Sequence, residues 1–348
     1  MGNISFLYLI LNFLINNFMK YYFKNLLFIC VFVFSISQIE AQKPKITIPK
    51  DTSFNVKSDY KKNLKYFPYI KPATDSLPNN VNAQRDVVYT TLKNTPFGDR
   101  DLHIDIFSPK KPGKHPALLM VHGGGWRAGD KSLQIPMAQK LAARGYVTVC
   151  IEYQLSLEAK YPAAVFNIKS AIRWMRANAE KYNIDINKIA VSGCSAGGQL
   201  ALLVGLTNGI ENKEGNHGNF GYSSDIQAII DIDGVVDFMA PESLNLTRKP
   251  NSPDIEWLGG SFYEKPEIWK DASSIFWANE KSPPIMFLNS GFPRFTAGQN
   301  ELIGMMNNWG IYSEVHKFDE KIHPFWLYNP WVNSVVNYMD NFLIKVFN

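Results

Sequence analysis

The sequence contains few cysteines for its length. There are three, Cys30, Cys150 and Cys194, among 348 residues. Small secreted domains that depend on disulfides carry many cysteines at regular spacings, and this chain does not. Cys30 lies in a segment that we expect to be removed, and the other two lie in a predicted buried strand and in a predicted turn. We therefore interpret Cys150 and Cys194 as small apolar core residues.

Blocks of basic residues and long apolar runs are also missing. The formal net charge is +5, but the lysines and arginines are scattered, whereas segments that bind nucleic acid concentrate them. Lys20 and Lys24 separate two N-terminal apolar runs, and neither run reaches the roughly 20 residues that span a bilayer. The sequence therefore predicts no nucleic-acid partner and no stable membrane span after processing.

The N-terminal region has the features of a secretory signal peptide. A short apolar run at residues 26–34 follows Lys20 and Lys24, as the central part of such a signal should. We expect residues 1–41 to be removed, with Met19 as an alternative start of translation. The predicted location of the mature protein is therefore secreted or periplasmic.

Residues 42–83 differ in composition from the rest of the chain. They are rich in lysine, proline and asparagine and show no sustained hydrophobic period. Two interpretations stay open, an extended arm that wraps the domain and a flexible linker. From residue 84 to residue 348 the pattern becomes regular, and we predict one folded domain there.

Strand patterns alternate with helical patterns in this domain. The predicted strands are residues 86–92, 102–107, 117–121, 146–153, 189–191, 226–232, 285–289 and 311–318. The predicted helices are residues 132–143, 163–182, a segment directly after residue 195, 302–309 and 332–346. This alternation predicts a mostly parallel sheet covered by helices on both faces. Residues 235–280 are irregular and are predicted to form a small cap insertion.

A G-x-S-x-G motif at residues 193–197 follows a short apolar run and precedes a helical pattern. Gly193 and Gly197 lack the β-carbons that would collide in so sharp a turn. The Ser195 hydroxyl is then exposed at the sheet edge, where a nucleophile belongs. The alternative is a glycine-rich turn that carries an incidental serine.

A second motif, His-Gly-Gly-Gly-Trp at residues 122–126, follows the predicted strand 117–121. Consecutive glycines allow the main chain to approach a reacting group closely. Backbone N–H groups placed there stabilise the negative oxygen of a tetrahedral intermediate, and losing one such donor costs about 3–4 kcal/mol. We predict an oxyanion hole formed by Gly124, Gly125 and Ala196. A glycine-rich turn without this role is the alternative.

With these motifs the chain resembles the α/β-hydrolase superfamily, and within it the secreted carbohydrate esterases that carry an HGGG motif. The resemblance covers residues 84–348 and implies an α/β-hydrolase fold and a serine hydrolase that acts on carboxylic esters without a cofactor. The segments that carry it are residues 122–126, 161–162, 174, 188–198, 257–260, 289–295, 311–316 and 323–326.

One histidine has the position expected of a general base. Six histidines are present, and His323 alone follows the last predicted strand. In this fold the catalytic residues occur in the order serine, acid, histidine. His323 is therefore the predicted base, whereas His122 belongs to the glycine loop, where the ring is more often structural.

The acidic residue is missing from its usual place. In this fold it normally follows the seventh strand, near Gly291, and no carboxylate occurs at residues 291–295. The resemblance favours Glu301, with Asp319 and Glu320 as alternatives. A weaker serine–histidine dyad and an inactive relative also remain open.

Three aspartates, Asp231, Asp233 and Asp237, form a D-x-D-G-x-x-D string. A calcium loop needs further ligands at fixed spacing, and these are absent. We therefore interpret the three as carboxylates at a strand end, and predict no metal site.

Aromatic residues are expected near the mouth of the site. Trp126, Tyr153, Phe295, Phe325 and Trp326 could form a platform on which a sugar stacks, or could be ordinary cap packing. Trp126, Tyr153, Phe295 and Trp326 are the predicted substrate-binding residues.

Together the motifs predict a secreted serine esterase in which Ser195 attacks and His323 acts as general base. The favoured substrate is an acetylated plant-type polysaccharide such as xylan or pectin, or a small ester. Alternatives are a feruloyl or short-chain lipid esterase, a serine peptidase and, from another class, a non-catalytic carbohydrate-binding relative.

Overall fold

The computed structural model describes residues 11, 13, 14, 16–22 and 47–348. Two compact units are present, Met1–Thr47 and Ile48–Asn348, and the second unit contains the sheet and its helical layers. Most of the predicted signal peptide, including its apolar run, lies outside the described residues. Within the described residues, no helix is both long and apolar enough to cross a membrane.

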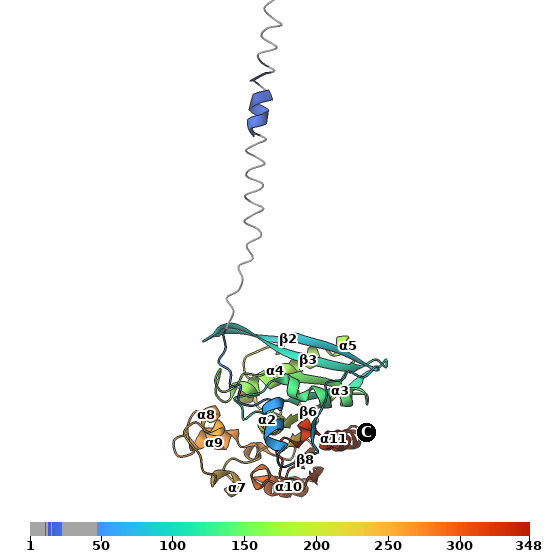
Figure 1. Cartoon of the computed structure of the whole chain (residues 1–348), viewed down its shortest axis with the longest axis vertical. Coiled ribbons are helices and arrows are strands. Elements are labelled where there is room, and N and C mark those ends of the chain that lie inside the picture. Colours follow the sequence, from blue (N-terminus) through green and yellow to red (C-terminus); the bar gives the residue numbers. More distant parts are fainter. Residues whose placement is uncertain (1–10, 12, 15, 23–46) are drawn as a thin grey trace, which may run out of the picture. The chain divides into compact units, whose positions relative to one another are not determined.

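An eight-stranded sheet forms the centre of the second unit (Figure 1). The strand order is β2-β3-β5-β4-β6-β7-β8-β9. The pairs β2–β3 and β3–β5 are antiparallel and the remaining pairs are parallel, which confirms the predicted mostly parallel sheet. The strands are β2 (Val81–Thr95), β3 (Gly98–Pro109), β4 (His115–Val121), β5 (Val147–Ile151), β6 (Ile184–Cys194), β7 (Ala228–Ile232), β8 (Ile285–Asn289) and β9 (Ser313–Lys317).

Both faces of the central strands are buried. Along β4, Leu119 and Val121 pack into one hydrophobic core, whereas Leu118 and Met120 pack into the core on the opposite face. Side chains alternate between the two faces of a strand. A strand that is covered on both sides is therefore apolar at every position, which explains the unbroken apolar run at residues 117–121.

Helices form a layer on each face of the sheet. One core contains residues of α4 (Ala163–Ala177), α6 (Ala196–Leu206) and α10 (Gln299–Asn308), and the other contains residues of α3 (Ile135–Ala142) and α11 (Trp331–Phe347). The shorter α5 (Ala179–Tyr182) follows α4 directly. The 3-10 helices are η1 (Lys131–Gln134), η2 (Glu211–Lys213), η3 (Ser274–Trp277), η4 (Pro293–Thr296) and η5 (Phe325–Leu327).

The segment between β7 and β8 forms the cap. It contains three short helices, α7 (Pro241–Leu244), α8 (Pro253–Leu258) and α9 (Pro266–Ala272), where the sequence predicted irregular structure. Trp257 and Trp269 are buried in the core that also contains α6. The cap is therefore packed onto the sheet domain through aromatic side chains.

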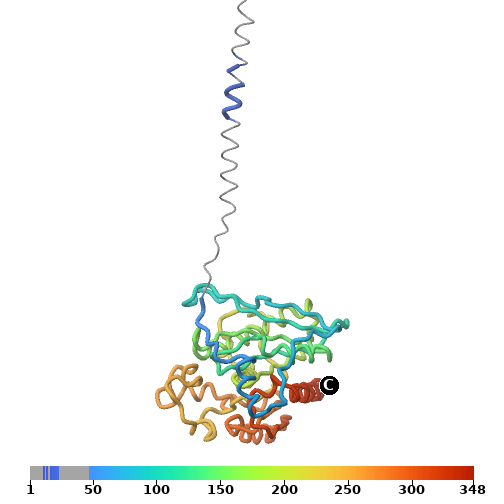
Figure 2. Tube along the Cα trace, viewed as in Figure 1, coloured from blue at the N-terminus to red at the C-terminus, as the bar shows by residue number. Residues whose placement is uncertain are grey.

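Residues 48–83 also pack on the domain. They contain α2 (Val56–Asn63) and β1 (Lys71–Pro72), and β1 pairs with β10 (Tyr328–Asn329) near the C-terminal helix. Figure 2 shows this early segment, in blue, reaching the red C-terminal part of the chain. The carboxylate of Asp51 lies 2.5 Å from Nε of Arg127. The segment predicted as an arm or a linker thus contacts the domain over much of its length.

Candidate active site

Ser195 lies in a sharp turn between β6 and α6. Its backbone has φ 57° and ψ −121°, a conformation that residues other than glycine rarely adopt. A Cβ on Gly193 would lie 1.9 Å from the carbonyl oxygen of Gly197, and a Cβ on Gly197 would lie 2.2 Å from the carbonyl oxygen of Val121. Both glycines are therefore required by backbone packing, as the motif predicted.

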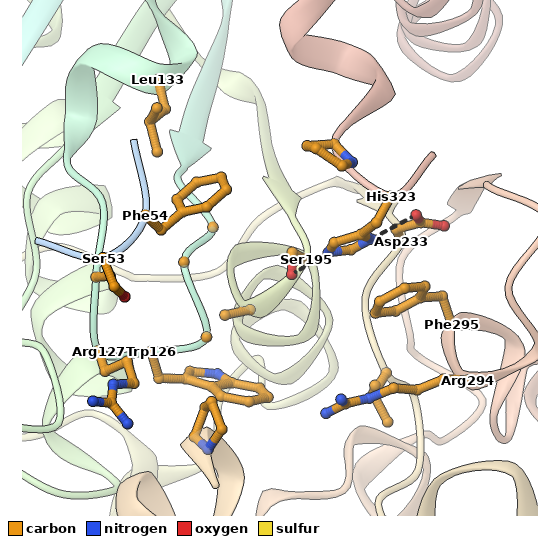
Figure 3. Close-up of a pocket in the computed structure, with 18 of the residues that line it drawn as sticks. Ser53, Phe54, Trp126, Arg127, Leu133, Ser195, Asp233, Arg294, Phe295 and His323 are labelled. Carbon is orange, nitrogen blue, oxygen red and sulfur yellow. Dashed lines mark hydrogen bonds and ion pairs between the residues drawn. The ribbon is translucent and has the colours of Figure 1, made fainter. Parts of the chain in front are cut away.

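Three side chains form a continuous hydrogen-bond chain (Figure 3). The Oγ of Ser195 lies 2.8 Å from Nε2 of His323, and Nδ1 of His323 lies 2.8 Å from Oδ2 of Asp233. The Asp233 carboxylate accepts a hydrogen bond from Nδ1–H of His323, and the neutral ring then has an unprotonated Nε2 that can accept the serine proton. The structure thus places the predicted nucleophile and base together and supplies an acid.

The acid that pairs with His323 is Asp233, which corrects the expectation of Glu301 or its alternatives Asp319 and Glu320. Glu301 is exposed in the first turn of α10, where a carboxylate complements the helix dipole. Asp319 and Glu320 lie in the loop after β9, and their backbone carbonyls face Gly291. None of the three is a hydrogen-bond partner of His323 among the described contacts.

Asp233 is held firmly at the end of β7. Its side chain is fully buried, and its Oδ1 accepts a hydrogen bond of 2.7 Å from the backbone N–H of Ser290, the residue after β8. Its own N–H donates to the carbonyl oxygen of Leu288 at 2.9 Å. The end of β8, where the acid is expected in this fold, therefore supports a carboxylate that comes from the neighbouring strand.

The sequence contained a signal for this acid. Asp233 comes directly after an apolar strand and directly before Gly234, in the position at which a parallel strand presents catalytic groups. The sequence pattern alone predicts the same strand-end position for Asp231, Asp233 and Asp237 and gives none of them a catalytic role. The choice among the aspartates needed the fold, because only the fold shows which of them faces His323.

The other two aspartates have separate environments. Oδ1 of Asp231 accepts from the N–H of Gly234 at 2.8 Å, and burial raises the pKa of Asp231 well above its ordinary value. Oδ1 of Asp237 accepts from the N–H of Met239 at 2.8 Å. The described residues contain no cluster of three or more histidine, cysteine, aspartate or glutamate side chains suited to a metal ion.

The glycine loop after β4 borders the nucleophile. Gly124 has φ 125° and Gly125 has φ 59°, and a Cβ on Gly124 would lie 2.1 Å from the carbonyl oxygen of Ala128. Gly124, Gly125 and Ala196 line the same cavity as Ser195. Ala196 opens α6, and the first N–H groups of a helix have no intrahelical acceptor. The predicted oxyanion donors are therefore gathered around Ser195.

His122 and Tyr153 stabilise this loop through hydrogen bonds and ring stacking. The buried Nδ1–H of His122 donates to the carbonyl oxygen of Gly123 at 2.8 Å, and Oη of Tyr153 donates to the carbonyl oxygen of His122 at 2.8 Å. The two rings stack at 4.5 Å, and burial lowers the pKa of His122 to about 4. Tyr153 does not line the cavity with Ser195, so its predicted role in substrate binding is corrected to support of the loop.

The other predicted aromatic residues do line the cavity. Phe295 stacks on the His323 ring with centroids 3.9 Å apart and planes at 7°, and Trp326 meets that ring edge-on at 5.2 Å. Trp126 is buried, stacks on Trp257 at 4.9 Å and donates its Nε1–H to Gln199 at 3.0 Å. Phe295 and Trp326 thus fix the orientation of the base, and Trp126 forms a wall. Phe325 is fully buried and does not line the cavity.

The cavity around Ser195 has a volume of about 320 Å³. Ser53 and Phe54 of the N-terminal segment form part of its lining, opposite Phe295 in Figure 3. The side chain of His323 is 29% exposed, so the reacting groups are accessible from solvent. Sequence reasoning left residues 42–83 without a role, and no local motif marks these two positions.

The chain is similar to known esterases in sequence. The family model described as BD-FAE matches residues 104–291, just over half of the chain. Esterase LipC of Mycobacterium tuberculosis is 30% identical over 224 residues, which are 63% of this chain and 55% of LipC. The chain spans about half the length of LipC and of two further curated relatives, the Mycobacterium tuberculosis proteins LipQ and LipM.

Solved structures show the same fold. A truncated carbohydrate esterase from gut microbiota superposes with a TM-score of 0.63 and 23% identity over 79% of this chain and 98% of that one. A thermophilic esterase of the Planctomycetes species Thermogutta terrifontis, Est2, gives a TM-score of 0.62 and 25% identity over 78% of this chain and 94% of that one. The predicted resemblance to α/β-hydrolase esterases is thereby confirmed.

Proposed function

Because the chain belongs to the BD-FAE family, we propose that it is a serine esterase that hydrolyses acyl esters through an acyl-enzyme on Ser195. The observation that carries the proposal is the chain of two 2.8 Å hydrogen bonds from Ser195 through His323 to Asp233. A serine hydroxyl is a weak nucleophile until a neighbouring base accepts its proton. The geometry provides that base and the carboxylate that orients it.

In the first half of the reaction, Oγ of Ser195 attacks the ester carbonyl carbon while its proton moves to Nε2 of His323. Nδ1–H of His323 keeps its hydrogen bond to Asp233, which stabilises the imidazolium. The tetrahedral intermediate then breaks its bond to the alcohol oxygen, and the proton on Nε2 passes to that alcohol as it leaves.

The second half of the reaction uses the same groups. His323 removes a proton from water, the water oxygen attacks the acyl-enzyme, and Ser195 regains the proton as the carboxylic acid leaves. In both halves the negative oxygen would face the N–H groups of Gly124, Gly125 and Ala196, which surround the same cavity.

The proposed substrate is an acetyl ester carried by a polysaccharide, in a secreted protein. A cavity of about 320 Å³ is at the small end of the range for ligand pockets, which favours a short acyl group. Phe295 is partly exposed beside His323 and lines the cavity, and sugars commonly pack on aromatic rings. A carbohydrate esterase among the structural relatives also supports a carbohydrate ester as the substrate.

The test measures release of 4-nitrophenol from 4-nitrophenyl acetate by the purified protein and by Ser195→Ala. We expect turnover by the wild type and a loss of at least roughly a thousandfold in the variant. His323→Gln should behave like Ser195→Ala. His316→Gln is the matched control, because His316 lies on β9, stacks on Tyr338 and does not line the cavity.

A panel of substrates then separates the classes. Acetylated xylan and acetylated pectin test the polysaccharide proposal, a feruloyl ester and a short-chain triglyceride test the other esterase classes, and a peptide tests protease activity. Correctly folded protein that hydrolyses none of these and still binds polysaccharide would favour the non-catalytic alternative.

A further inference from the structure

One cationic side chain of the candidate active site has no part in the proposed hydrolysis. Arg294 lies in η4, a few residues after β8, and lines the same cavity as Ser195 and His323. Figure 3 shows its guanidinium extending into the pocket on the side of Phe295. A guanidinium in this position can contact a substrate whose ester carbonyl lies at Ser195.

Arg294 shares its counter-ion with another arginine. Its ion pair among the described residues is with Asp254, where Nη2 and Oδ2 are 3.6 Å apart. The same Oδ2 accepts a shorter hydrogen bond, 2.8 Å, from Nε of Arg248. One buried carboxylate therefore faces two guanidinium groups, and its closer contact is with Arg248. Within this group of three side chains, two positive charges face one negative charge.

Arg294 also has hydrogen-bond donors to spare. Its Nε is buried and has no partner among the described residues, although a guanidinium carries five N–H donors. Burial disfavours its charged form more than Asp254 favours it, so the pKa of Arg294 is lowered, while an arginine still remains protonated. The charge of Arg294 is therefore only partly compensated by Asp254.

The second arginine in the lining differs in this respect. Nε of Arg127 lies 2.5 Å from a carboxylate oxygen of Asp51, and its Nη1 lies 2.9 Å from one of Glu256. Nη1 also donates to the backbone carbonyl of Asn251 at 3.1 Å. Two carboxylates already neutralise Arg127, so Arg294 is the pocket cation that is available to a ligand.

We propose that Arg294 forms a subsite for a carboxylate group of the ester substrate. The planar guanidinium matches a carboxylate with two parallel hydrogen bonds. This inference rests on the proposed esterase function of the same pocket. The carboxylate can belong to the alcohol part, as in an acetylated uronic acid unit, or to the acyl part, as in the half ester of a dicarboxylic acid.

The experiment compares charged and neutral esters of nearly equal shape. For the alcohol part the pair is 3-acetoxybenzoate and 3-acetoxybenzamide, and for the acyl part it is 4-nitrophenyl hydrogen adipate and 4-nitrophenyl hexanoate. The readout is the ratio of kcat/KM for the charged ester to that for the neutral ester. In Arg294→Gln this ratio should fall about 10- to 100-fold for the pair whose carboxylate lies on the part of the substrate that Arg294 binds. The fall should come mainly from a higher KM for the charged ester.

Two further measurements keep the test decisive. Arg294→Lys retains the positive charge but not the planar guanidinium. Its kcat/KM ratio should lie between the ratio of Arg294→Gln and that of the unaltered protein. In the unaltered protein, KM for the charged ester should rise with salt concentration more steeply than KM for the neutral ester. Arg144→Gln is the control for the loss of one positive charge, because Arg144 pairs with Asp340 on α11 and does not line the cavity.

The outcomes separate this inference from the proposed function. If the unaltered protein hydrolyses the neutral esters, and Arg294→Gln leaves both ratios within about twofold, the carboxylate subsite is wrong and the esterase proposal stands. An equal fall of the ratio in Arg144→Gln would also overturn the subsite. If no ester of either pair is hydrolysed, the esterase proposal itself fails.

Discussion

At the scale of single residues, the candidate site depends on which carboxylate reaches His323. Asp233 has φ 54°, and its backbone N–H and its Oδ1 are both bonded to residues at the end of β8. These contacts aim Oδ2 at Nδ1 of His323 and hold it there. The residue is buried and preorganised, which is what orientation of a general base requires.

Asp233→Asn tests this assignment. The Asn side chain can keep its carbonyl oxygen toward the N–H of Ser290, and its NH₂ group would then face Nδ1 of His323. That arrangement favours the His323 tautomer with the proton on Nε2. In this tautomer Nε2 cannot accept the proton of Ser195. We expect kcat to fall about ten-thousandfold, or ~5 kcal/mol, in steady-state hydrolysis of an activated ester.

Glu301→Gln, Asp319→Asn and Glu320→Gln provide the matched comparison. Each removes one carboxylate that is not bonded to His323, and each should leave kcat within about threefold of the unaltered protein. A large loss in any of these three, together with a small loss in Asp233→Asn, would reverse the assignment.

A second residue-scale prediction concerns pH and His122. Its pKa is lowered to about 4 by burial, from an ordinary value of 6.5. Below pH 6.5 the unfolded chain binds a proton at this residue that the folded chain does not bind, so the folded state loses stability as the pH falls toward 4. The full loss is about 3 kcal/mol.

His122→Gln should lack this contribution. Urea unfolding at several pH values should therefore show the difference in unfolding free energy between the unaltered protein and the variant shrinking as the pH falls from 6.5 to 4. A difference that is constant over this interval would show that His122 does not titrate with a lowered pKa in the folded state.

At the scale of elements, the turn from β6 to α6 is determined by backbone contact. The strand predicted at residues 189–191 in fact begins at Ile184, because its early part pairs with the start of β4. The turn itself agrees with the motif, since Gly193 and Gly197 leave no space for a Cβ. Local sequence was therefore sufficient for the turn and insufficient for the length of the strand.

Gly193→Ala should disrupt this turn. Its Cβ would lie 1.9 Å from a backbone oxygen that cannot move without displacing α6, so we expect a loss of about 3 kcal/mol or more in unfolding free energy. Gly304→Ala is the matched control within α10, because a Cβ there meets nothing within 4 Å. It should stabilise the protein by about 0.5–1 kcal/mol. Equal effects in urea unfolding would contradict this account.

At the scale of the whole second unit, the N-terminal segment completes the cavity. Asp51 pairs with Arg127, and Phe54 lines the pocket together with Leu133 of η1. Tyr328 near the C-terminus donates to Asp59 of α2 at 2.6 Å. Parts of the chain that are far apart in the sequence are thus joined around the reacting groups, and the shape of the pocket depends on all of them.

Phe54→Ala should enlarge the pocket, because Phe54 is part of its lining. We expect the ratio of kcat/KM for 4-nitrophenyl hexanoate to that for 4-nitrophenyl acetate to rise roughly tenfold, since added space for apolar groups is worth ~1–3 kcal/mol. Phe67→Ala is the control, because Phe67 packs edge-on against Trp331 and does not line the cavity. A ratio that changes equally in both variants would indicate a general loss of packing.

Features that depend on residues close together in the chain can be predicted from the sequence alone. The G-x-S-x-G turn, the glycine loop and the position of His323 after the last major strand follow from local sterics and chain order. The identity of the acid and the role of Tyr153 depend instead on contacts between distant parts of the chain. β7 and β8 are adjacent parallel strands with Ile232 opposite Leu288, so the residue that follows either strand can reach the base. The order of residues in the chain does not show which of the two adjacent strand ends carries the acid. The packing of the folded chain places Asp233, at the end of β7, against His323.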